Sequence, residues 1–119
     1  MIQTDTMTLG EIAHARSGDK GNHANVGVIA YTQAGYEYLR LHLTSDAIVG
    51  FFAPLQPTRV ERFELPRLWA FNFLLYNALG GGASQSLRID TQGKLLGISV
   101  LELELPRPAN RDAMRRIIV

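Results

Sequence analysis

The chain of 119 residues is 46% hydrophobic and 19% charged, which is the composition of one globular domain with a single core. A formal net charge of +1 and the absence of cysteine exclude an extended nucleic-acid-binding surface, disulfide bonds and thiolate chemistry. The first residues lack the basic start and apolar run of a signal peptide, and no stretch approaches the roughly 18 apolar residues of a membrane span. We therefore expect a cytoplasmic protein with neither nucleic-acid nor membrane partners.

The first part of the chain predicts a β-hairpin followed by helices. Residues 9–16 and 25–32 are short, apolar and partly β-branched, with glycines between them, which predicts two antiparallel strands. Apolar side chains at helical spacing predict a helix over residues 34–43. Thr44, Ser45 and Asp46 offer N-cap oxygens for a second short helix over residues 47–53, which Pro54 ends.

The second part predicts a strand, a buried helix and a terminal hairpin. Residues 60–65 form a charged strand near a sheet edge. Residues 68–79 are apolar on every face, which predicts a helix buried against the sheet and ended by the glycines that follow. Residues 86–90 and 95–105 predict two paired strands, with a β-bulge near Val100.

These elements define the expected fold class. Strands and helices segregate as in an α+β two-layer sandwich of the ferredoxin-like type, with a mixed sheet of about five strands and the helices on one face. We expect residues 1–105 to form the domain. Residues 106–119 form an arginine-rich tail, with four arginines against one aspartate.

A polar stretch, ARSGDKGNHAN at residues 15–25, lies between the first two predicted strands. One interpretation is ordinary turn chemistry, in which Ser17 and Asp19 accept backbone N–H bonds and two glycines adopt positive φ. The other is an anion site, in which Arg16, Lys20 and freed backbone N–H groups hold a carboxylate or phosphate that Asn22 and Asn25 orient. The surplus of side-chain donors favours the second.

Three further positions bear on this site. His23 is of a residue type that can act as an acid or a base, but the sequence identifies no partner that would orient it. An amide at Asn72 inside an apolar run costs roughly 1–3 kcal/mol unless it is hydrogen-bonded, so we expect a partner, either a sheet carbonyl or the polar stretch. Arg88 is either a sheet-edge charge or a second cation beside Arg16.

A second polar stretch contains three glycines, Ser86 and Arg88. We expect residues 16–25 and 80–90 to lie in contact and to form one site for an anion or a carbonyl. The candidate ligand- or partner-binding residues are Arg16, Ser17, Asp19, Lys20, Asn22, His23, Asn25, Asn72, Gly80, Gly81, Gly82, Ser86 and Arg88.

Other site chemistries have no motif here. The sequence contains no phosphate-binding P-loop, no dinucleotide-binding glycine pattern and no H-E-x-x-H. The three histidines, at positions 14, 23 and 42, have no recognised ligand spacing. We therefore expect neither a metal nor a cofactor, and no catalytic residue is identified.

The segments ARSGDKGNHANVGVIA, ELPRLWAFNFLLYNALGGGASQSLRID and GKLLGISVLELEL resemble the small ferredoxin-fold domain found at the C-terminus of acyclic terpene utilisation protein A and in stand-alone proteins of similar length. The resemblance covers residues 9–105. It implies a companion to a larger domain in the catabolism of acyclic terpenes or branched acids as acyl-CoA thioesters, and it assigns no reaction. The matching positions are Arg16 to Asn22, Asn25, Leu65, Pro66, Asn72, Gly80 to Gly82, Ser86 to Arg88 and Asp90.

Two functions follow as alternatives. The chain is a small subunit that completes the site of a separately encoded large subunit, or it is a self-sufficient homo-oligomer that binds or converts a small molecule or an acyl-CoA. The lack of an evident nucleophile and base favours the first. In isolation we expect a homo-oligomer, because the aromatic side chains of residues 69–76 cannot all face one sheet from a single helix.

Overall fold

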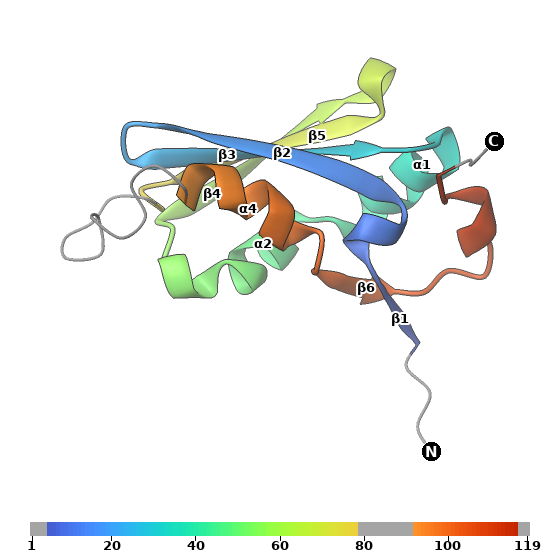
Figure 1. The fold of residues 1–119 in the computed structure, drawn as a ribbon. Helices are drawn as coiled ribbons and strands as arrows, with labels where there is room; N and C mark the ends of the chain where they lie inside the picture. Colours follow the sequence, from blue (N-terminus) through green and yellow to red (C-terminus); the bar gives the residue numbers. More distant parts are fainter. Residues whose placement is uncertain (1–4, 79–91, 117–119) are drawn as a thin grey trace.

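The computed structural model describes residues 5–78 and 92–116 (Figure 1). The strands are β1 (Thr6–Thr8), β2 (Ala13–Lys20), β3 (His23–Ala30), β4 (Arg59–Leu65), β5 (Ala70–Tyr76) and β6 (Glu104–Pro106). The α-helices are α1 (Gln33–His42), α2 (Ser45–Phe51) and α4 (Gln92–Val100). Short 3-10 turns include η1 (Leu9–Glu11), η2 (Ala53–Leu55), η3 (Pro66–Leu68) and η5 (Arg111–Ala113). None of the helices in these two ranges is long and apolar enough to cross a bilayer.

The main sheet has four antiparallel strands in the order β2-β3-β5-β4. The β2–β3 hairpin closes through the two residues Gly21 and Asn22, and Gly21 adopts a φ of 64°, which a glycine accommodates without strain. Helices α2 and α4 lie together on one side of this sheet (Figure 1). The other side carries no α-helix among the described residues.

Strand alternation builds the core on the helix side of the sheet. In β3, every second residue from Ala24 to Ala30 is buried, and in β5 the side chains of Phe71, Phe73 and Leu75 are fully buried. The helices contribute Leu39, Ile48, Leu96 and Val100 to the same core.

A separate two-stranded ribbon of β1 and β6 ties the two ends of the described chain together. Met7 and Leu105 are buried in it, and the C-terminal residues continue to pack on the body. Arg111 forms an ion pair of 3.1 Å with Glu11, and Met114 is buried. Residues 106–116 are therefore docked on the domain.

Several expected elements are confirmed. The first hairpin is antiparallel, α1 and α2 follow it, and the Thr44 side chain caps α2 by accepting a hydrogen bond of 3.1 Å from the Ala47 N–H. Strand β4 is at a sheet edge, as its charged composition predicted. The two strands, however, extend further into the polar stretch than the expected bounds of residues 16 and 25, and they leave a turn of only two residues.

Two other expectations are wrong. Residues 70–76 form the interior strand β5 instead of a helix, because a short run with apolar residues on both strand faces fits either a strand or a buried helix. Residues 92–100 form helix α4 instead of a strand, and Val100 ends that helix instead of forming a bulge. Both described sheets are consequently antiparallel, and the expected mixed sheet of about five strands is replaced by sheets of four and two strands.

Candidate functional site on the open face of the sheet

The side of the main sheet that faces away from the helices is called the open face here. Alternation along each strand sends every second side chain to it. The described side chains and glycines on this face are His14, Arg16 and Gly18 of β2, His23, Asn25, Gly27 and Ile29 of β3, Ala70, Asn72, Leu74 and Tyr76 of β5, and Arg59, Glu61, Phe63 and Leu65 of β4.

One row of register partners crosses the centre of the open face. Arg16 pairs with Gly27, Gly27 pairs with Asn72, and Asn72 pairs with Phe63. Because Gly27 has no side chain, the row is hollow between Arg16 and Asn72. A cationic group, an amide and an aromatic ring thus border a floor of bare backbone.

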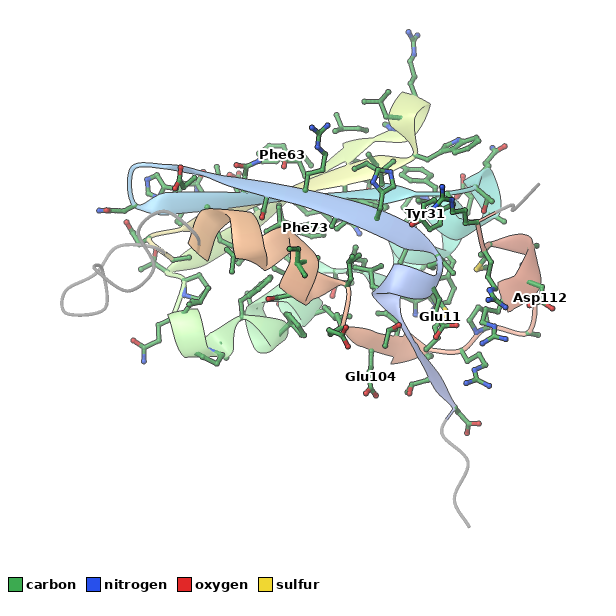
Figure 2. The ribbon with its side chains drawn as sticks, in the orientation of Figure 1. Glu11, Tyr31, Phe63, Phe73, Glu104 and Asp112 are labelled. Atoms are coloured by element: carbon green, nitrogen blue, oxygen red, sulfur yellow. The ribbon has the colours of Figure 1, made fainter. Side chains whose placement is uncertain are left out.

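The hollow above this row has a volume of about 540 Å³. It is lined by Arg16, Gly27, Ile29, Phe63, Leu65, Leu68, Ala70, Phe71 and Asn72. Figure 2 shows Phe63 on the open side and Phe73 on the opposite side, between the sheet and α4. Phe63 is 44% exposed and Leu68 is 64% exposed, so the apolar wall of the hollow is accessible.

The polar groups of the hollow have no partner among the described residues. Neither the Arg16 guanidinium nor the Asn72 amide forms a hydrogen bond or ion pair with residues 5–78 or 92–116. Asn25 lies one diagonal step from both, and its Oδ1 is 3.3 Å from the position that a Cβ on Gly18 would take. The expected internal partner of Asn72 is therefore not found, since its amide lies half-buried at the open face and not within a core helix.

Other predicted residues lie elsewhere. Ser17 belongs to the helix side, where its Oγ accepts a hydrogen bond of 2.7 Å from the Gly97 N–H of α4. Asp19 follows the same side by alternation and is exposed, and Asn22 is exposed in the hairpin turn. Lys20 ends β2 and pairs in register with His23. The polar stretch is thus divided between the two faces of the sheet.

His23 lies at the far end of the open face, in a different environment. Its Nδ1 accepts a hydrogen bond of 3.0 Å from the Asn77 N–H, and its ring meets the edge of Tyr76 at 5.2 Å between centroids. The Tyr76 hydroxyl donates to Glu61 at 2.8 Å, and the Arg59 guanidinium lies 4.2 Å from the Tyr76 ring centroid. These groups satisfy one another, and none forms a nucleophile and base pair.

Gly80, Gly81, Gly82, Ser86 and Arg88 lie outside the described residues, as does the expected contact between residues 16–25 and 80–90. Within the described ranges, no three His, Asp or Glu side chains gather closely enough to hold a metal ion.

The apolar residues of the hollow were missed from the sequence. Gly27, Phe63 and Leu68 are not among the residues that the sequence singles out, and Leu65 is noted there only as a position that matches the family. The signal was present as a two-residue period: in β4, Phe63 and Leu65 alternate with charged residues, and in β5, Asn72 alternates with phenylalanines.

An α+β domain with helices on one side of an antiparallel sheet is the ferredoxin-like class. The family model of the AtuA ferredoxin-like domain matches residues 7–106, nearly the whole chain, and the chain belongs to this family. Comparison with curated proteins found no significant match. Comparison with solved structures found none either.

Proposed function

We propose that this chain is the small companion subunit of a separately encoded large domain of the acyclic terpene utilisation family, acting in the cytoplasm on acyclic terpene or branched acyl-CoA compounds. It docks through the open face and contributes Arg16, Asn25 and Asn72 to a site for an anion or a carbonyl. The observation that carries the proposal is the hollow, in which polar groups without a partner among the described residues lie beside exposed apolar side chains.

The apolar part of the open face supports docking. Phe63, Leu65 and Leu68 all line the hollow, are at least 40% exposed and lie within six consecutive residues of β4 and η3. Large apolar side chains that gather on one exposed surface, flanked by polar groups, are typical of protein interfaces. In isolation, the same surface favours association of two copies of the chain.

The polar part of the open face supports a shared site more than independent catalysis. An arginine and two amides bind and orient a carboxylate or carbonyl, but they do not supply a nucleophile or a base. The described side chains that could act as a base near the hollow, such as Glu61, already hold a partner. The reacting groups are therefore assigned to the large subunit.

The test is co-expression with a large-domain protein from the same genome, followed by measurement of mass by light scattering. We expect a stable complex that Phe63→Glu weakens by about 100-fold, since a charge would be buried without a partner at the centre of the interface. The matched control is Leu41→Glu on α1, because Leu41 is 67% exposed and lies away from the open face.

Complex formation that Phe63→Glu and Leu41→Glu leave equally strong would place the interface elsewhere. A failure to form any complex, together with a stable homo-oligomer that binds or converts an acyl-CoA, would favour the self-sufficient enzyme instead.

A further inference from the structure

We propose that the hollow on the open face binds a monocarboxylate with an apolar tail. The carboxylate lies over Gly27 against the Arg16 guanidinium, with the amides of Asn72 and Asn25 beside it. The tail lies across Phe63, Leu65 and Leu68. The inference deepens the proposed function, because it names the ligand class of the same face, and it requires no large subunit for binding.

The hydrogen-bond donors of the hollow and its glycine floor indicate that the head group of the ligand is a carboxylate. Neighbouring strands are about 4.8 Å apart, so Arg16 and Asn72 stand roughly 10 Å apart at their backbones with only Gly27 between them. This space admits a planar carboxylate, which a guanidinium binds through two parallel hydrogen bonds. The described lining holds one cationic side chain and no helix N-terminus, which matches a single negative charge better than a phosphate dianion.

The charges around Arg16 leave it uncompensated among the described residues. Glu61, the carboxylate of the open face, is bonded to Tyr76 and paired with Arg59. Glu64 of β4 is held 2.7 Å from Arg62 on the helix side. His14, the neighbouring titratable group on β2, stacks on Tyr31 and adds no negative charge. A ligand with one negative charge complements this surface.

The apolar wall of the hollow indicates that the ligand has an apolar tail. Ile29, Phe63, Leu65, Leu68 and Ala70 supply continuous apolar surface beside the polar end. A carboxylate without a tail would leave this surface in water, and an apolar molecule without a charged head would leave Arg16 unpaired. Both parts of the ligand are therefore needed for binding.

Two variants and one control separate these contributions. Arg16→Gln removes the charge of the head-group site. Gly27→Val fills the floor, and a Cβ at Gly27 would meet its nearest atoms at ordinary contact distances of 3.8 and 3.9 Å. Arg59→Gln is the matched control, since Arg59 is an exposed arginine on the same face outside the hollow.

The experiment titrates the isolated chain with octanoate, octanol, acetate and inorganic phosphate, and follows binding by calorimetry and by amide chemical shifts in NMR spectra. We expect octanoate to bind at least tenfold more tightly than the other three, with shifts centred on Gly27 and Asn72. Arg16→Gln and Gly27→Val should each weaken octanoate binding at least tenfold, whereas Arg59→Gln should leave it unchanged.

Octanol binding as tightly as octanoate would overturn the proposal, because the charge would then be irrelevant. Phosphate binding as tightly as octanoate, or octanoate binding that survives Gly27→Val in a folded variant, would also overturn it. The outcome is separable from that of the companion-subunit proposal: the ligand titration uses the isolated chain, and complex formation is measured without octanoate.

Discussion

Arg62 of β4 connects the edge strand of the main sheet to the C-terminus of α1. Its Nη1 donates hydrogen bonds of 3.0 Å to the Arg40 carbonyl and 2.9 Å to the Leu43 carbonyl, while Nη2 lies 2.7 Å from a Glu64 carboxylate oxygen. The guanidinium also lies 5.2 Å from the centroid of the Phe71 ring. A cation at this position satisfies carbonyls that the helix leaves without an internal partner.

The substitution Arg62→Met keeps an apolar stem over Phe71 and removes the donors. A hydrogen bond that involves a charged group contributes about 1.5–3 kcal/mol, but water reaches the freed carbonyls of a helix end, and the ion pair with Glu64 is partly exposed and adds less than about 1 kcal/mol. We expect a loss of about 2 kcal/mol in the free energy of unfolding. At about 4 °C for each kcal/mol in a domain of this size, the melting temperature falls by about 8 °C.

The control is Arg59→Met on the same strand. The Arg59 side chain is 62% exposed on the open face, so its loss should change the free energy of unfolding by no more than about 0.5 kcal/mol. Urea denaturation of both variants, followed by circular dichroism, measures the difference. Equal destabilisation by the two substitutions would refute the assignment of Arg62 as the link between β4 and α1.

Three further predictions concern other positions. Gly97→Ala should destabilise the fold by about 1–2 kcal/mol in urea denaturation despite the better helix propensity of alanine, because the new Cβ would lie 3.0 Å from the Ser17 backbone; an unchanged midpoint would contradict this close packing. Burial raises the pKa of Tyr36, so the stability that its neutral form contributes is present below about pH 10 and is lost as the pH rises further. Tyr36→Phe should therefore reduce the loss of stability between pH 7 and about pH 11. The substitution should also raise the free energy of unfolding at pH 7 by about 1 kcal/mol, because the hydroxyl is buried with no hydrogen-bond partner in the described structure. A lower denaturation midpoint of the variant at pH 7 would reveal a partner. In the hairpin turn, Gly21→Ala should cost about 1 kcal/mol because φ is 64° at that position, whereas Asn22→Ala should cost no more than about 0.5 kcal/mol, and thermal melts that rank the two in the opposite order would contradict the turn geometry.

Local signals in the sequence were sufficient for the elements whose structure depends on nearby residues. Thr44 precedes a short apolar segment and caps α2, and the charged alternation of β4 marks an edge strand. The three quoted segments were also sufficient for the family, which the match over residues 7–106 shows. Arg16, Asn25 and Asn72 were singled out as candidate site residues because each places more hydrogen-bonding capacity in its segment than a turn or a core requires.

Tertiary structure alone decided what the apolar segments become. Residues 70–76 have apolar residues on both faces of β5, and such a short apolar run fits a buried helix as well as a strand. Only the alternation around Asn72 indicates a strand, and the pairing of β5 between β3 and β4 decides it. Helix α4 is equally ambiguous by itself, and its state follows from Leu96, Gly97 and Val100 packing against the sheet. Pairing of β3 with β5 brings Gly27 beside Asn72, which lies 45 residues later in the chain, and pairing of β2 with β3 adds Arg16 to the same row. The hollow therefore exists only once the sheet is assembled, because the strand pair β2–β3 and the strand pair β4–β5 meet only through the long-range pairing of β3 with β5.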